Sequence, residues 1–205
     1  MMLPFTYTGG QLATNAYLIP NAQDSAYLCI DAPEGLAAAI RDHHLKIDAL
    51  LLTHGHFDHV WDAAAIAREH GCPVYIHAGD VPLLRRSESR FAQLEAFVDL
   101  PVPANGSLLW EAGGRRFTLF HVPGHSAGSV AFHEPAEDRL FGGDLIFAGG
   151  IGRTNTPEAR EELLLGISRH LLPLPETTGI YPGHGPSTTL AAEKDNPYFQ
   201  TAVPA

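Results

Sequence analysis

The stretch Thr53-His54-Gly55-His56-Phe57-Asp58-His59 places four side chains that can bind a metal within six residues. His54 and His56 are two residues apart, so in an extended segment both imidazole rings leave the same face. Asp58 and His59 follow at once, and this change of period predicts a chain that turns into a helix and aims at a second point. Such an arrangement serves either two neighbouring metal ions or one ion with an outer shell of hydrogen-bonding residues.

The residues before this stretch predict where it lies in the fold. Ile47-Asp48-Ala49-Leu50-Leu51-Leu52 is an apolar run of the kind that forms a buried strand. The alternative is a run of solvated surface histidines, but polar side chains at the end of a buried strand are typical of a functional site. We therefore predict a divalent-metal site at the end of this strand.

The whole chain has the composition of an ordinary soluble globular protein. Its 205 residues are 45% hydrophobic and 18% charged, and we expect one domain that spans residues 1–205. The formal net charge of −10, without a Lys/Arg cluster, argues against a nucleic-acid partner. The sequence shows no signal-peptide pattern and no apolar run of the roughly 20 residues that a membrane span needs. These features predict a cytoplasmic protein without a membrane partner, in which Cys29 and Cys72 are reduced thiols.

Strand and helix patterns alternate in the first half of the chain, and short strands dominate the second half. Strands are predicted at 17–19, 26–30, 47–53, 73–76, 108–110, 117–120, 129–132 and 139–141. Helices are predicted at 34–43, 63–67, 80–97, 157–172 and 187–194. Gly113-Gly114 predicts a hairpin turn. Because no linker or tandem repeat divides the chain, we expect sheets covered by helices in one α/β unit.

Three further segments place a glycine directly before a possible metal ligand. They are Pro123-Gly124-His125, Gly142-Gly143-Asp144 and Pro182-Gly183-His184, and each follows an apolar run that reads as a strand. Glycine permits unusual backbone angles and close approach, which suits strand-end loops that crowd around a small centre. One such segment alone would be weak evidence, because Pro-Gly is common in turns. Three of them beside the first cluster make a coincidence hard to sustain.

Together these segments supply five histidines and two aspartates. The candidate metal ligands are His54, His56, Asp58, His59, His125, Asp144 and His184. Seven nitrogen and oxygen donors exceed the need of one tetrahedral ion, but they suffice for two ions if one carboxylate bridges them. No cysteine takes part, so we expect two divalent metal ions, with zinc as the first expectation and iron or manganese as alternatives.

The remaining histidines are not expected to bind metal. His77, His121 and His133 alternate with apolar neighbours, as strand residues do, and helix-end or surface positions are predicted for His43, His44, His70 and His170. Asp31 follows a predicted strand, where its carboxylate could either hydrogen-bond a ligand ring or cap the next helix.

The motif His54-x-His56-x-Asp58-His59, with the distal His125, Asp144 and His184, resembles the metallo-β-lactamase superfamily, and the likeness extends along nearly the whole chain. This resemblance implies a four-layer αβ/βα sandwich with the metals at the edge of two facing sheets. It assigns His54, His56 and His125 to one metal ion and Asp58, His59 and His184 to the other, with Asp144 as the bridge.

Within the superfamily the chain is most similar to the hydroxyacylglutathione hydrolase (glyoxalase II) branch, in its short bacterial form. The likeness rests on residues 123–129, 149–154, 181–186 and 193–198. Two departures stand out. The chain stops soon after Pro197, without the C-terminal helical region through which full-length glyoxalase II enzymes contact glutathione, and Asn155 stands where many relatives carry Asp. Neither departure affects a candidate metal ligand.

The resemblance implies metal-assisted hydrolysis of a small-molecule thioester such as S-lactoylglutathione. Asp58 would ligate a metal and also orient the attacking hydroxide. Three alternatives remain open. A persulfide dioxygenase would hold one iron through His54, His125 and Asp144, and a lactonase or esterase would use the same dinuclear site. A binding protein on a decayed scaffold is disfavoured, because no candidate ligand is lost.

Overall fold

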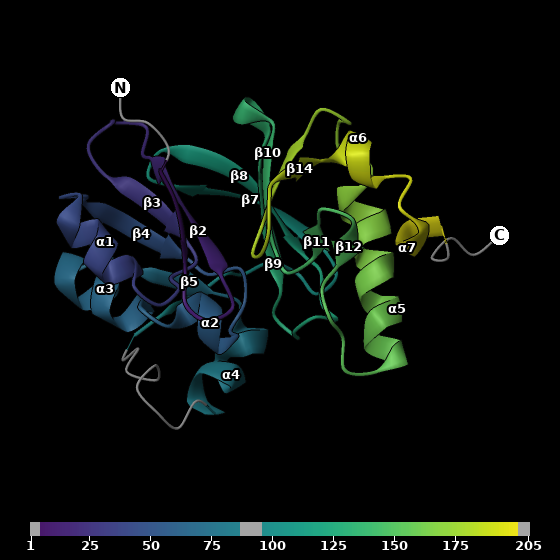
Figure 1. The fold of residues 1–205 in the computed structure, drawn as a ribbon, viewed down its shortest axis with the longest axis horizontal. Helices are drawn as coiled ribbons and strands as arrows, with labels where there is room; N and C mark the ends of the chain where they lie inside the picture. The colour runs from purple at the N-terminus through teal and green to yellow at the C-terminus, as the bar shows by residue number, and fades with distance from the viewer. Residues whose placement is uncertain (1–4, 87–95, 201–205) are drawn as a thin grey trace.

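Two six-stranded sheets face each other in the computed structural model, which describes residues 5–86 and 96–200 (Figure 1). The first sheet has the strand order β1-β2-β3-β4-β5-β6. Its strands are β1 (Phe5–Gly9), β2 (Thr14–Pro20), β3 (Tyr27–Ile30), β4 (Ile47–Leu51), β5 (Val74–Ile76) and β6 (Val98–Asp99). Strands β1 to β3 pair antiparallel, and strands β3 to β6 pair parallel.

The second sheet has the strand order β14-β13-β10-β9-β8-β7, and all its pairs are antiparallel except β10 with β13. Its strands are β7 (Ser107–Ala112), β8 (Arg115–His121), β9 (Val130–Glu134), β10 (Arg139–Gly143), β13 (Gly179–Pro182) and β14 (Thr188–Thr189). The predicted turn Gly113-Gly114 joins β7 to β8, with both glycines at positive φ. A small separate hairpin consists of β11 (Ile146–Phe147) and β12 (Gly150–Ile151).

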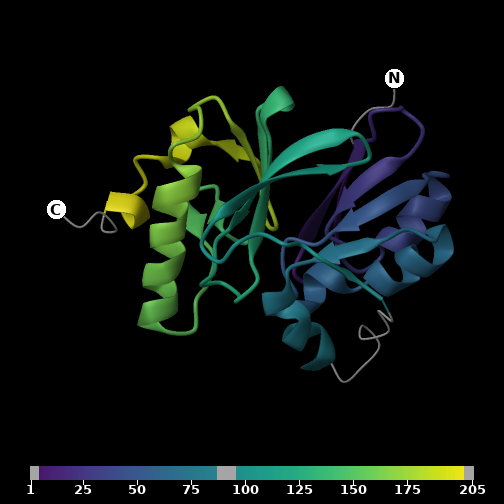
Figure 2. The same cartoon turned by 180° about the vertical axis from the view of Figure 1, so that it is seen from behind.

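Helices cover the outer faces of both sheets (Figures 1 and 2). On the side of the first sheet lie α1 (Leu36–Asp42), α2 (Phe57–Val60), α3 (Ala63–His70), the 3-10 turn η1 (Ala78–Asp80) and α4 (Val81–Arg86). On the side of the second sheet lie α5 (Pro157–Gly166), its π-helical continuation Ile167–Leu171, α6 (Leu190–Glu193) and α7 (Pro197–Gln200). A short 3-10 turn, Pro135–Glu137, joins β9 to β10.

Three apolar layers hold these elements together, and alternation along the strands explains them. In β2, Leu18 packs toward the helices of the first sheet, whereas Tyr17 and Ile19 pack between the sheets. In β9, Phe132 belongs to the layer between the sheets and Ala131 to the layer beneath α5. Because strands buried on both faces need apolar residues at every position, these segments read as continuous apolar runs. The predicted four-layer αβ/βα sandwich is confirmed.

Two predicted helices are wrong in part. Of the helix predicted at 80–97, α4 covers Val81–Arg86, residues 87–95 lie outside the described part, and residues 96 and 97, just before strand β6, are not helical. The helix predicted at 187–194 is only α6, because Thr188 and Thr189 pair with β13 as strand β14. In the second helix the β-branched Thr188 and Thr189 pair with β13, and this pairing overrides the local helical pattern.

Helix boundaries elsewhere follow local signals. The helix predicted at 34–43 begins only at Leu36, because Gly35 before it adopts a left-handed φ of 89°. Helix α5 begins where Thr156 accepts a hydrogen bond from the Ala159 N–H at 3.2 Å and Pro157 occupies the first helical position. Across residues 5–86 and 96–200, every helix falls short of the length and apolarity that crossing a bilayer requires.

The layer between the sheets should carry much of the stability, which two matched leucines test. Leu119 on β8 is fully buried in this layer, whereas Leu109 on the neighbouring β7 is 81% exposed. We expect Leu119→Ala to lower the free energy of unfolding by about 2–5 kcal/mol, because it leaves a cavity in the core. Leu109→Ala should change it by no more than about 0.5 kcal/mol. Chemical denaturation of both variants measures the difference, and equal effects would contradict this account of the layer.

Candidate metal centre

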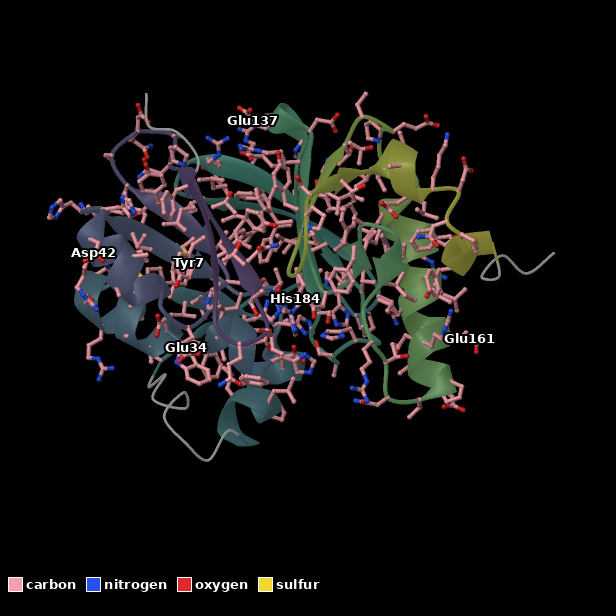
Figure 3. All side chains as sticks on the ribbon, in the orientation of Figure 1. Tyr7, Glu34, Asp42, Glu137, Glu161 and His184 are labelled. Carbon is pink, nitrogen blue, oxygen red and sulfur yellow. The ribbon has the colours of Figure 1, made fainter. Side chains whose placement is uncertain are left out.

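All seven predicted ligands lie at one edge of the molecule, where strand ends of the two sheets meet. His54 and His56 follow β4, and Asp58 and His59 lie on α2, which continues the same segment. The second sheet supplies the others, from the loop between β8 and β9 and from the ends of β10 and β13: His125, Asp144 and His184. Figure 3 shows His184 at the junction between the two halves of the sandwich.

His54, His56 and His125 form the first group of candidate ligands, and their ligand atoms all lie within 4.8 Å of one another. His125 Nε2 is 3.2 Å from His54 Nε2 and 2.8 Å from His56 Nδ1. A tetrahedral ion with metal–nitrogen bonds of about 2.0–2.1 Å places its nitrogen ligands roughly 3.3 Å apart. The three nitrogens are therefore spaced as ligands of one ion would be.

Asp58, His59 and His184 form the second group. His59 Nε2 lies 3.4 Å from His184 Nε2, and Asp58 Oδ2 lies 3.4 Å from the first nitrogen and 3.3 Å from the second. Two of these residues come from the first sheet's side and one from the second, so the group exists only because the sheets are held together.

Asp144 lies between the two groups. Its Oδ2 is 3.4 Å from His125 Nε2 and 3.4 Å from His184 Nε2, while its Oδ1 is 3.3 Å from His59 Nε2. Oδ1 is buried and has no hydrogen-bond partner. A buried carboxylate oxygen without a donor is costly unless a cation satisfies it. The side chains therefore fit two divalent ions with Asp144 between them.

Four of the five histidines have one ring nitrogen occupied by the protein. Nδ1 of His125 donates to the Arg153 carbonyl at 2.8 Å, and Nδ1 of His184 faces the Leu12 carbonyl at 3.1 Å. For the other two, the Nδ1 partners are Thr53 Oγ1 for His54 and Asp31 Oδ2 for His59. A proton held on Nδ1 leaves Nε2 unprotonated and pointing at the centre, which is how proteins orient histidine ligands toward a metal.

Asp31 hydrogen-bonds the ring of a candidate ligand, which is one of the two roles predicted for it. Its Oδ2 lies 2.8 Å from His59 Nδ1, and its Oδ1 accepts the Thr53 N–H at 2.8 Å. Thr53 Oγ1 also donates to Asp31 and lies 3.0 Å from His54 Nδ1, so the carboxylate orients His59 directly and His54 through Thr53. Helix α1 starts at Leu36 without a side-chain cap, so Asp31 does not cap it.

Strand β2 contributes residues that the sequence did not identify as part of the site. Thr14 Oγ1 donates to Asp58 Oδ2 at 2.7 Å. Asn15 Nδ2 donates to the carbonyls of Pro182 and Gly185, and Tyr17 Oη donates to the Pro182 carbonyl at 2.7 Å. These bonds hold the loop of His184 against the first sheet. A polar residue in a buried strand is the only local signal that could have pointed to them.

The glycines before the distal ligands are required by close approach. Gly124 has a φ of 128°, and a Cβ there would overlap the Ala159 carbonyl oxygen of α5. At Gly183 a Cβ would overlap Asp144 Oδ1 and His59 Cε1, which are themselves part of the site. The glycines therefore let two strand-end loops reach the centre, as their position in the sequence predicts.

The electrostatics of the site favour a cation. Burial opposes ionisation of Asp58, but hydrogen bonding with His184 and the field of His59 outweigh burial and lower its pKa to about 2. The pKa of Asp144 is also well below its usual range, because the same two histidines outweigh its burial. Burial opposes protonation of His59, yet Asp31 and Asp144 raise its pKa well above the ordinary value. Both carboxylates stay ionised, and a metal that binds has to compete with protons, so binding weakens as the pH falls.

The other histidines lie apart from the two groups, as predicted. His121 and His133 are strand residues, as predicted. His77 is predicted as a strand residue too, but it follows β5, caps η1 and stacks on His121 with ring centroids 4.2 Å apart. His43 and His70 lie at helix ends. Within residues 5–86 and 96–200, the candidate ligand groups contain only the seven predicted residues.

Asp144→Ala tests the position between the two groups. We expect this variant to lose both metal ions and the activity together, because its carboxylate lies beside ligands of both groups. Elemental analysis of the purified variant measures the metal content. Asp42→Ala removes an exposed carboxylate at the end of α1, far from His184 in Figure 3, and should leave metal content unchanged. Full activity in Asp144→Ala would contradict the assignment of Asp144 as the carboxylate that bridges the two ions.

Comparison with known sequences identifies the family. The model of the metallo-beta-lactamase superfamily matches residues 9–194. An uncharacterised protein of Mycobacterium tuberculosis is 33% identical, over 97% of this chain and 98% of its own length. The probable metallo-hydrolase YqgX of Bacillus subtilis is 32% identical over 93% and 94% of the two chains. The hydroxyacylglutathione hydrolase GloC of Haemophilus influenzae is 35% identical over 82% and 83%.

Solved structures agree with this result. The B3 metallo-beta-lactamase BLEG-1 superposes with a TM-score of 0.83 at 33% identity, over 96% of this chain and 99% of its own. TTHA1623, solved in a di-iron-bound form, superposes with a TM-score of 0.73 at 37% identity, over 94% and 98%. The fold, the strand-end cluster of histidines and aspartates, and these matches show that the chain belongs to the metallo-β-lactamase superfamily and is a hydrolase of that superfamily.

Proposed function

We propose that this chain hydrolyses thioesters of the S-lactoylglutathione type with two divalent metal ions. The observation that carries the proposal is the presence of two complete groups of three candidate ligands on either side of Asp144. The similarity to a hydroxyacylglutathione hydrolase along four fifths of both chains supports the thioester. The net charge of −10 favours a small-molecule substrate over a nucleic acid.

His54, His56 and His125 would hold the first ion, and Asp58, His59 and His184 the second, with Asp144 shared. Bound there, two divalent ions would supply Lewis acidity and would lower the pKa of bound water to about 7. The nitrogen and oxygen donors suit zinc first and also accept iron or manganese. The di-iron form of TTHA1623 supports the same count of ions for a relative.

Asp58 is the residue that we assign to orienting the attacking water. Thr14 Oγ1 donates to its Oδ2 at 2.7 Å, which holds the carboxylate in place. With a pKa of about 2, Asp58 stays ionised and accepts a hydrogen bond from the water as the water attacks the thioester carbonyl. The leaving thiol has an ordinary pKa of about 8.5, so its sulfur departs as the thiolate without a strong general acid.

Two cavities flank the candidate ligands and give room for the two parts of a thioester. The larger, about 450 Å³, opens beside His56 and His125, and we assign it to the thiol part. The smaller, about 110 Å³, lies beside Asp58 against the rings of Phe57 and Trp61, and we assign it to a short acyl group. This cavity is the smaller of the two and is bounded by the Phe57 and Trp61 rings, so we expect it to favour a short acyl group.

The test combines metal content with turnover. Protein purified without chelator should contain near two metal ions per chain by elemental analysis and should hydrolyse S-lactoylglutathione. The Asp144→Ala variant serves as the inactive control, and thioesters with longer acyl chains should be hydrolysed more slowly if the smaller cavity holds the acyl group.

Other results would select the rival activities. One iron per chain, no thioester turnover and oxygen consumption with glutathione persulfide would establish the dioxygenase and reject the proposal. Two ions with hydrolysis of lactones or simple esters, but not of thioesters, would keep the dinuclear site and reject the substrate.

A further inference from the structure

Asp80 is a buried carboxylate outside the seven candidate ligands. It ends the 3-10 turn η1 after strand β5, and its exposed fraction is 0%. Its Oδ2 accepts the Gly55 N–H at 2.8 Å and the Ser126 hydroxyl at 2.6 Å, and its Oδ1 accepts the Gly128 N–H at 2.7 Å. Hydrogen bonds in a dry interior, where water does not compete, hold their partners firmly.

The donors belong to the two loops that carry the first group of ligands. Gly55 lies between His54 and His56 on the loop after β4, while Ser126 follows His125 on the loop between β8 and β9. One carboxylate therefore joins a loop of the first sheet to a loop of the second, directly beside the place where His56 Nδ1 and His125 Nε2 approach to 2.8 Å.

The backbone around Asp80 is shaped for this contact. A Cβ at Gly55 would lie 2.9 Å from the Asp80 carbonyl oxygen, and one at Gly128 would lie 2.6 Å from the Asp80 nitrogen. A Cβ at Gly79 would lie 2.8 Å from the Ala127 carbonyl oxygen. Real Cβ atoms do not approach this closely, so the three glycines let η1 fit tightly against both loops.

A second carboxylate acts on the other group, which gives a comparison within the same molecule. Asp31 contacts His59, a member of the second group, together with Thr53. Asp80, in contrast, makes no hydrogen bond to the side chain of a candidate ligand. Its hydrogen bonds come from the backbone N–H groups of Gly55 and Gly128 and from the Ser126 hydroxyl. It therefore positions His56 and His125 by fixing the loops that carry them, without a hydrogen bond to either ring.

We propose that Asp80 is a positioning residue that sets the spacing of His56 and His125 and thereby the affinity of the ion held by the first group. Residues that orient metal ligands typically change metal affinity by roughly 10–100-fold when they are lost. The inference rests on the two-ion site of the proposed function, but it does not depend on which bond the enzyme hydrolyses.

The test uses Asp80→Asn, which keeps the size of the side chain but turns one acceptor oxygen into an NH2 group that faces backbone and hydroxyl donors. We expect the affinity of one ion to fall roughly 10–100-fold while the other ion binds as in the wild type. Metal content after dialysis against graded chelator measures both affinities without any activity assay. Far-UV circular dichroism checks that the variant is folded.

Ligand variants identify which ion is affected. His56→Ala weakens the first group, so adding Asp80→Asn to it should cause little further loss. Adding Asp80→Asn to His184→Ala should weaken the remaining ion as much as it does in the wild type. Additive losses with His56→Ala, equal weakening of both ions, or wild-type affinity for both ions in Asp80→Asn would each overturn the proposal.

Ser126→Ala provides a milder variant that removes one of the three hydrogen bonds. It should weaken the same ion by a smaller factor, and unchanged affinities would count against the proposal. If Asp80→Asn does not fold, Ser126→Ala alone decides. A wild-type chain that binds two ions but does not hydrolyse thioesters would refute the proposed substrate and leave this inference standing.

Discussion

The candidate metal centre depends on one constraint, the packing of two sheets against each other across a single apolar layer. Phe117, Phe132 and Phe141 from the second sheet fill this layer against Leu28 and Leu51 of the first. Protein interiors are packed as densely as organic crystals, so the layer fixes the separation of the sheets. Only then can strand ends from both sheets bring ring nitrogens and carboxylate oxygens within about 3.4 Å of one another.

The apolar layer sets the separation of the sheets, and hydrogen bonds then fix the ligand side chains and the loops that carry them. Asp31 and Thr14 orient His59 and Asp58, and Asp80 joins the loops of His56 and His125. Each of these contacts crosses between different segments, and the acceptors Asp31 and Asp80 are buried where water competes little. The centre is therefore held by a second set of polar residues beyond the candidate ligands themselves.

The sequence predicted what depends on short-range signals. Each candidate ligand stands at or soon after the end of an apolar run, and four of them directly follow a glycine, so the seven could be named and the strand-helix alternation read without a structure. The features that the sequence did not predict depend on partners that lie far away along the chain. Strand β14 forms because Thr188 meets Ile180 of β13, and Asp80 acts on Gly128, which lies 48 residues away. Asp31 illustrates the limit: its sequence position suits two roles, and only the nearby ring of His59 decides between them.

The hydrogen bonds from strand β2 to the His184 loop have a consequence for how the chain folds during synthesis. Asn15 bonds to Gly185 across 170 residues of chain, and Tyr17 to Pro182 across 165. During synthesis the ribosome has to release nearly the whole sequence before these partners can meet, whereas His54, His56 and His125 emerge much earlier. Closing so long a loop is among the slower steps in folding. Closure of the His184 loop onto strand β2 is therefore expected to complete the centre late in folding.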